Sequence, residues 1–178
     1  VLLGLVIASV LWWFKTFSQI FEPYLVILNS LPKIALGPII IIWVGAGMKA
    51  IIVMALAISL VVTVMELLNG FNNTDKDKIK MARTFGATKA QIFTKIVLPS
   101  NVTTLVNSLK INLGLSLVGV IAGEFLVSKA GLGYLIVYGG QVFKLDLVMA
   151  SVIILAVFAA IIYKLVLIFE KIVLKNRR

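Results

Sequence analysis

The sequence predicts an all-α, polytopic bundle of transmembrane helices, and three observations support this fold class. First, 61% of the 178 residues are hydrophobic and only 13% are charged, with a mean hydropathy of +1.12. Soluble domains are about 45–50% apolar and about 25% charged, so most apolar side chains here must face lipid or neighbouring helices. Second, the apolar residues form long runs. Third, the basic residues collect in the gaps between these runs, as the positive-inside rule describes for membrane proteins.

The first apolar run, residues 1–14, is too short to cross a bilayer core of about 30 Å at a rise of about 1.5 Å per residue. We interpret it as the end of a truncated span, because the chain starts with Val1 and the run begins at once. Five spans are then visible in the sequence, and a sixth is expected upstream. Lys15–Ser30 has mixed polarity, with Glu22 next to Pro23, and predicts a short helix at the membrane interface.

The next apolar stretch, residues 34–70, is too long for one ordinary span and is interrupted only by Lys49 and Glu66. Gly45 and Gly47, just before Lys49, are typical of a turn. The stretch therefore predicts two antiparallel membrane helices.

Two more spans are predicted in the second half of the chain. Residues 101–125 begin polar and finish apolar, and residues 147–169 are interrupted only by Lys164. A Gly-rich segment, 126–146, connects these two spans, and a basic tail, 170–178, follows the second.

Residues 71–99 are the clearly water-facing stretch, because six cations and two acids interrupt them. The charged residues are Lys76, Lys78, Lys80, Arg83, Lys89 and Lys95 against Asp75 and Asp77. Thr74 or Asp75 is a candidate helix cap, and Pro99 marks a break at the other end. Apolar residues recur at three- or four-residue spacing and predict an amphipathic helix: Ile79, Ala82, Phe85 (or Gly86), Ala90 and Phe93.

The charge distribution predicts the orientation in the membrane. If residues 71–99 are cytoplasmic, then residues 15–33 and the C-terminal tail are also inside, together with most of the cations. The segments outside would then hold only three cations, Lys49, Lys129 and Lys144. We therefore expect a multi-pass protein of the cytoplasmic membrane, with the loop 71–99 and the C-terminus in the cytoplasm.

The composition also excludes several functions. The chain has no Cys and no His, which excludes disulfides and Cys-based metal sites and argues against zinc sites and His-based catalysis. The net charge of +10 does not indicate nucleic-acid binding, because the chain has little of the polar surface that a nucleic-acid-binding protein needs. The sequence also has no Walker-type Gly-x-x-x-x-Gly-Lys-Ser/Thr motif, so any ATP hydrolysis must belong to another subunit. We expect no cofactor, no metal and no enzyme activity in this chain.

Two short motifs in the water-facing loop carry a family resemblance. The run from Lys80 to Thr88, followed by Ile96-Val97-Leu98-Pro99, resembles the EAA loop of binding-protein-dependent ABC permeases. In that loop Glu-Ala-Ala precedes a Gly and a later Ile-x-Leu-Pro. Here Gly86 stands four residues after Ala82 and ten before Ile96, which fits the pattern. One departure is that Lys80 occupies the motif's Glu position, so the ion pair of that Glu is not expected here.

The resemblance implies a fold, partners and a docking site. The whole chain, 1–178, would be one permease domain of the type I (MetI-like) importer fold, and residues 71–99 its cytoplasmic coupling loop. Two ATPase subunits would bind below, an extracytoplasmic solute-binding protein would dock above, and the permease would form a homodimer in the lipid. The residues expected to couple to the ATPase are Ala82, Arg83, Thr84, Gly86, Ala87, Thr88, Leu98 and Pro99.

We expect each part of the loop to have a separate role in this coupling. Gly86 and Ala87 would allow close approach of the ATPase, and Arg83 and Lys89 would offer charged contacts. Leu98-Pro99 would fix the exit of the loop into the next span.

The substrate class follows only from a resemblance to one branch of the family. Leu31-Pro32-Lys33-Ile34-Ala35-Leu36-Gly37-Pro38 and Trp43-Val44-Gly45 are similar to the nitrate/sulfonate/taurine branch, which implies a small anion such as an aliphatic sulfonate, taurine or nitrate. Relatives with the same signature import thiamine-precursor pyrimidines. An ion-coupled secondary transporter and a non-transporting membrane scaffold are the two rival functions, although the sparse embedded charge argues against the first.

Four polar residues in the span 101–125 are candidates for the lining of a translocation path: Asn107, Ser108, Asn112 and Glu124. Ionisable residues inside membrane segments often face a cavity or a partner, which favours a function for Glu124. The alternative is that all four form structural hydrogen bonds to neighbouring helices.

Overall fold

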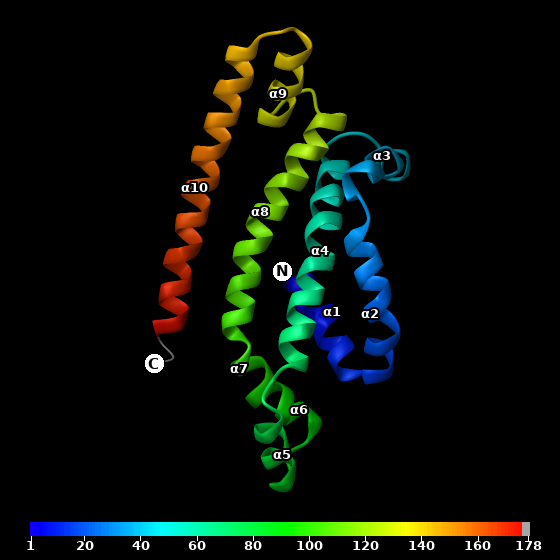
Figure 1. Cartoon of the computed structure of the whole chain (residues 1–178), viewed down its shortest axis with the longest axis vertical. Coiled ribbons are helices and arrows are strands. Elements are labelled where there is room, and N and C mark those ends of the chain that lie inside the picture. Colours follow the sequence, from blue (N-terminus) through cyan, green and yellow to red (C-terminus); the bar gives the residue numbers. More distant parts are fainter. Residues whose placement is uncertain (176–178) are drawn as a thin grey trace. The chain divides into compact units, whose positions relative to one another are not determined.

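A computed structural model describes the backbone of residues 1–175 and the side chains of residues 1–172. Within this part of the chain there is no β-strand, which confirms the all-α prediction. Figure 1 shows the helices in chain order. They are α1 (Leu2–Trp13), α2 (Lys15–Ser30), the 3₁₀-helix η1 (Lys33–Leu36), α3 (Gly37–Val44), α4 (Met48–Asn72), α5 (Lys76–Thr84), α6 (Lys89–Ile92), the π-helix η2 (Phe93–Val97), α7 (Leu98–Ser100), α8 (Val102–Val127), α9 (Leu132–Gln141) and α10 (Leu145–Lys175).

Among the residues that the structure describes, three helices are long and apolar enough to cross a membrane. They are Met48–Asn72, Val102–Val127 and Leu145–Ile172, and the most apolar 18 residues of each have mean hydropathies of 2.7, 1.6 and 2.9. A helix of about 20 residues spans the hydrocarbon core of a bilayer, so each of these has sufficient length. The chain is therefore a multi-pass membrane protein.

The region between Lys15 and Val44 differs from the sequence prediction. A separate span was expected to begin near Ile34, but α3 has only eight residues, which is about 12 Å of helix and too short to cross alone. Pro32, at the N-cap of η1, and the Gly37-Pro38 start of α3 interrupt helical hydrogen bonding here. Only together do Lys15–Ser30 and Lys33–Val44 have the length and the apolar composition of a span, and the two helices are bent by 86°. The five expected spans thus correspond to three long helices, this broken pair and the short α1.

The chain forms two compact units. The first contains residues 1–29 and 61–109, and the second contains residues 30–60 and the chain from 110 onward. In the first unit the largest fully buried side chains come from the second half of α4, from η2 and from α8, namely Thr63, Val64, Leu67, Phe71, Val97 and Ser108. In the second unit α9 lies alongside α10 (Figure 1).

Glycines allow the early part of α4 and the late part of α8 to pack closely within the second unit. A Cβ added at Gly119 would lie 2.5 Å from Ala55 Cα, and one added at Gly123 would lie 2.9 Å from Ile51 Cα. Because these obstacles are backbone atoms, they cannot rotate away. The spacing of four residues places both glycines on one helix face, as in small-xxx-small packing of membrane helices.

We predict that Gly119→Ala destabilises the protein, whereas Gly114→Ala does not. Overpacking at Gly119 should cost about 1–3 kcal/mol. At Gly114 an added Cβ meets nothing within 4 Å, so the alanine should gain about 0.5–1 kcal/mol from helix propensity. Thermal or denaturant unfolding of the protein in detergent measures both variants. Equal stability of the two variants would contradict this account of the α4–α8 contact.

Candidate functional site

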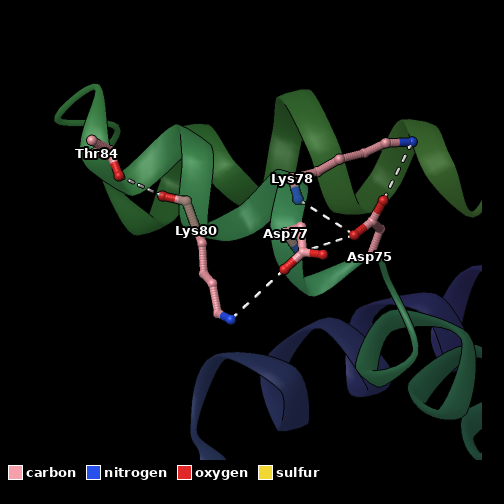
Figure 2. Close-up of polar contacts among 5 residues, drawn as sticks. All are labelled: Asp75, Asp77, Lys78, Lys80 and Thr84. Carbon is pink, nitrogen blue, oxygen red and sulfur yellow. Dashed lines mark hydrogen bonds and ion pairs between the residues drawn. The ribbon is translucent and has the colours of Figure 1, made fainter.

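The water-facing segment begins with a capped helix, α5. Asp75 is its N-cap, and Oδ1 of Asp75 accepts hydrogen bonds from the backbone N–H groups of Asp77 at 2.9 Å and Lys78 at 3.4 Å (Figure 2). Lys78 also pairs with Asp75 at 3.9 Å, and Lys80 pairs with Asp77 at 3.7 Å. All four of these side chains are at least half exposed, so the ion pairs contribute little stability. The cap satisfies orphan N–H groups of the helix and fixes its start.

Gly86 ends α5 in a left-handed conformation. Its φ is +77°, its N–H donates to the carbonyl of Arg83 at 2.9 Å, and the N–H of Ala87 donates to the carbonyl of Ala82 at 3.0 Å. These two bonds form a Schellman motif, in which a glycine is favoured because it has no Cβ. An added Cβ at Gly86 would meet nothing within 4 Å. Within this chain the glycine thus serves the turn, a role that the sequence analysis did not assign to it.

A second cap restarts the helix directly after this turn. Thr88 and Gln91 form a capping box, with the Thr88 N–H donating to Gln91 Oε1 at 2.8 Å and the Gln91 N–H donating to Thr88 Oγ1 at 3.3 Å. The helix continues through α6 and η2 into α7, where Leu98 and Pro99 are half buried. Thr88 therefore has a structural role in addition to the docking role expected for it.

The two ends of the segment are tied together by a buried hydrogen bond. Nδ2 of Asn101 donates to Oγ1 of Thr74 at 2.8 Å and to the carbonyl of Val97 at 2.9 Å. Thr74 and Asn101 are each only 6% exposed. Residues 75–100 thus form a closed loop, whose two ends are joined between the end of α4 and the start of α8.

Aromatic rings hold η2 against the ends of α1 and α4. The Phe93 ring lies 5.0 Å from that of Trp12, 6.5 Å from that of Trp13 and 5.6 Å from that of Phe71, measured between centroids. Such pairs contribute about 0.5–1.5 kcal/mol each beyond the area that they bury. We call Trp12, Trp13, Phe71 and Phe93 the aromatic cluster.

Lys89 completes this attachment. Its Nζ donates to the main-chain carbonyl of Trp13 at 2.5 Å and lies 5.7 Å and 5.5 Å from the ring centroids of Trp12 and Trp13. A cation is favoured here both by the C-terminal end of α1 and by the π faces. Lys89 was expected to offer a charged contact to another protein, but it is engaged within the chain.

The two faces of α5 have different surroundings. Lys76, Ile79, Lys80 and Arg83, at helical spacing, line a cavity of about 610 Å³ that is also lined by the ends of α1 and α4. Met81 is on the other face with Phe85, and these side chains are 59% and 81% exposed. The prediction that Phe85 belongs to a continuous apolar face with Ile79, Ala90 and Phe93 was wrong, because the Gly86 turn breaks the helical period.

The predicted docking residues fall into three groups. Arg83 and Ala87 line the cavity. Thr84, Gly86 and Thr88 are exposed, Ala82 is half buried, and Leu98 with Pro99 forms the base of the segment. Met81 and Phe85 lie beside these residues and are exposed. Neither was in the expected docking set, although two large apolar residues at i, i+4 in a charged helix are a recognisable signal.

The four path candidates all lie on α8 but in different environments. Asn107 is exposed, Ser108 is fully buried and Asn112 is 6% exposed. Ser108 donates a hydrogen bond to the carboxylate of Glu66, whose Oε2 is buried without a hydrogen-bond partner among the described side chains. Glu66 was not singled out from the sequence, although an ionisable residue in a span is the usual signal for a role.

Glu124 has a structural contact at the start of α9. Its Oε2 accepts a hydrogen bond from the Gly133 N–H at 2.7 Å, and a Cβ on Gly131 or Gly133 would collide with the carboxylate. A carboxylate at a helix N-terminus satisfies an orphan N–H and the helix dipole. In addition, Lys110 forms an ion pair with Glu170 at 2.6 Å.

The described residues contain no group of three or more Asp, Glu, His or Cys that could hold a metal ion. The site thus consists of a closed, capped, cationic segment with one face toward a cavity and one toward water. Such a segment can bind another macromolecule, because its exposed face combines charge with large apolar side chains.

Comparison with known proteins places this segment in a family context. The whole chain, residues 1–178, matches the family described as "Binding-protein-dependent transport system inner membrane component". A probable ABC transporter permease protein of Haemophilus influenzae is 29% identical, over 91% of this chain and 66% of that protein. The formylaminopyrimidine transport permease protein ThiX of Halalkalibacterium halodurans is 27% identical, over 75% of this chain and 54% of that protein.

The taurine transport system permease protein TauC of Escherichia coli is 25% identical, over 89% of this chain and 58% of that protein. The chain thus spans between 54% and 66% of the length of these three relatives. The match to the family extends over the spans and the water-facing segment alike, so this chain belongs to the binding-protein-dependent transport system inner membrane components.

Proposed function

We propose that this chain is the membrane-spanning permease subunit of an ATP-driven importer, and that residues 75–100 dock on its ATPase. The observation that carries the proposal is the family match over residues 1–178, which includes the closed, water-facing segment. ATP hydrolysis belongs to a separate subunit, since the sequence has no Walker-type motif. The chain itself supplies the membrane path and the contact that links the path to the ATPase.

The docking contact is formed by the outward face of α5. Phe85 is 81% exposed and Met81 59% exposed, and large side chains of this kind typically provide most of the energy of a protein interface when a partner covers them. Ala82, Thr84, Gly86 and Thr88 surround them and leave room for a cleft to close around Phe85. Arg83 and Ala87 support this face from the cavity side.

Movement of the ATPase reaches the membrane through the base of the segment. The hydrogen bond between Asn101 and Thr74 joins the end of α4 to the start of α8, and the aromatic cluster joins η2 to α1 and α4. A displacement of α5 would therefore tilt membrane helices instead of bending a free loop. Leu98-Pro99 lies where this displacement enters α8.

The complete importer requires a defined orientation of this chain in the membrane and additional protein subunits. We propose that the segment and the C-terminus are cytoplasmic, that two copies of this chain form a homodimer with two ATPase subunits, and that an extracytoplasmic solute-binding protein delivers the solute. Asn107, Ser108 and Asn112 are proposed to line the path. Glu124 could take part only by giving up its hydrogen bond to Gly133.

The solute is proposed to be a small anion such as an aliphatic sulfonate, taurine or nitrate. One relative is named for taurine and another for formylaminopyrimidine, so a thiamine-precursor pyrimidine is the alternative. Ligand screening of the solute-binding protein encoded beside this chain distinguishes the two. Tight binding of a pyrimidine with no binding of sulfonates or other small anions would reject the anion assignment.

We predict that Phe85→Ala, alone or with Met81→Ala, weakens binding of the cognate ATPase. Loss of a buried aromatic contact at an interface typically costs at least about 1–2 kcal/mol, or about tenfold in Kd. The measurement is ATPase binding to the purified permease, together with ATP-driven uptake in proteoliposomes. Phe143→Ala is the matched control, because Phe143 is 89% exposed but lies between α9 and α10. Equal losses in the two Phe variants, or none in either, would contradict the proposed docking face.

We also predict that Gly86→Ala and Gly86→Asn behave differently. Alanine in the left-handed region costs about 1–2 kcal/mol, whereas asparagine tolerates it. Gly86→Ala should therefore speed hydrogen exchange in α5 and lower ATPase binding, and Gly86→Asn should retain most of both. Gly140→Ala is the control for exchange, since an added Cβ there meets nothing within 4 Å. If Gly86→Asn abolishes ATPase binding while α5 exchange is unchanged, Gly86 serves the close approach of the ATPase instead of the turn.

A further inference from the structure

The cavity behind α5 is lined by five cations and no carboxylate. The cations are Lys15, Lys76, Lys80, Arg83 and Lys89, and the cavity volume is about 610 Å³. Small-molecule sites commonly have volumes of about 300–1,000 Å³, so the space is large enough for a ligand. A concave surface lined by charges of one sign concentrates their field and attracts ions of the opposite sign.

Three of these cations have no ion-pair partner within the described part of the chain. Lys89 is held by the Trp13 carbonyl, and Lys80 lies 3.7 Å from the carboxylate of Asp77. Among residues 1–172, the side chains of Lys15, Lys76 and Arg83 form no ion pair. The cavity therefore retains positive charge that the chain itself does not neutralise.

The cavity lies where apolar membrane helices meet the water-facing segment. Trp12 and Lys15 lie on either side of the α1–α2 junction, and Phe71 and Asn72 are the last residues of α4, a helix that is long and apolar enough to cross a membrane. Trp and Lys at the end of a span are typical of the level of lipid headgroups. Trp12, Phe71, Ile79 and Ile92 give the same cavity an apolar part. A ligand that carries both an anionic group and an apolar body matches this lining better than a free anion does.

We propose that this cavity binds the phosphate group of an anionic phospholipid. Lys15, Lys76 and Arg83 contact the phosphate, and the glycerol and the first acyl carbons lie against Trp12 and Ile79, which line the cavity and are only half buried. Basic pockets between membrane helices on the cytoplasmic side are known to bind such headgroups. The bound lipid fills the space behind α5 and supports its outward face. The inference does not require that the chain transports a particular solute.

Native mass spectrometry of the full-length chain tests the proposal. The protein is extracted from nanodiscs of phosphatidylcholine with a minor fraction of phosphatidylglycerol of equal acyl chains, and the retained lipids are counted. Wild-type protein should retain phosphatidylglycerol preferentially. Lys15→Gln combined with Lys76→Gln should reduce that preference about tenfold, since each cation near an anionic headgroup adds to the affinity for the lipid.

A matched control and a rescue variant separate a site from general attraction to basic protein. Lys78→Gln with Lys95→Gln removes the same number of charges, from the water-facing segment but outside the cavity lining, and it should leave the preference unchanged. Lys15→Arg with Lys76→Arg should restore it, which shows that the loss in the Gln variant comes from the missing charge. Equal loss in the two Gln variants would overturn the proposal.

Two further arms test other occupants of the cavity. Saturation by inorganic phosphate, without any preference for phosphatidylglycerol, would indicate a free-anion site and overturn the lipid assignment. Displacement of phosphatidylglycerol by the cognate ATPase would show that an acidic protein surface occupies the cavity, which would also overturn it. Retention of the lipid in the ATPase complex is the result that we expect.

Discussion

The contact of Phe93 with Trp12 and Phe71, together with the Lys89 bond to Trp13, determines how the water-facing segment is presented. These contacts fix η2 and α6 against the ends of two apolar helices. The Schellman turn at Gly86 and the capping box at Thr88 then link α6 to α5 with little freedom. The rotation of α5 about its axis follows, so that Arg83 faces the cavity and Phe85 faces water. Without this attachment, six cations in a polar stretch would form an ordinary solvated loop.

In the membrane helices, too, charged side chains are bound by other groups of the same chain. Lys110 is neutralised by Glu170, and the Glu124 carboxylate is held by the Gly133 N–H. Pairing of this kind lowers the cost of charged groups in an apolar environment. Glu66 is different, because one oxygen bonds to Ser108 and the other is buried without a partner among the described side chains. A buried carboxyl group that the described residues do not fully satisfy, next to the proposed path residue Ser108, is a reason to include Glu66 in tests of the path.

The all-α class, the long spans and the cap of α5 at Asp75 could be predicted from the sequence, because each depends on local composition or on a short pattern. The family match confirms the resemblance drawn from the spacing of Gly86, Ile96 and Pro99. The break between α2 and α3 was harder to predict, since an apolar run does not reveal where Pro32 and Gly37-Pro38 interrupt the helix. Contacts between distant residues, such as Lys89 with Trp13 or Ser108 with Glu66, have no local signature. The same is true of the cavity, whose lining comes from α1, α2, α4, α5 and α6.

The central claim is that α5 meets its ATPase with the Met81–Phe85 face while the opposite face stays against the cavity. The sequence has no cysteine, so single cysteines introduced along residues 76–88 can be labelled with a water-soluble thiol reagent, with and without the cognate ATPase. The account predicts that the ATPase protects positions 81, 82 and 85 with helical periodicity and leaves positions 76, 80 and 83 unchanged. Protection centred on positions 76, 80 and 83, or no protection at all, would contradict it.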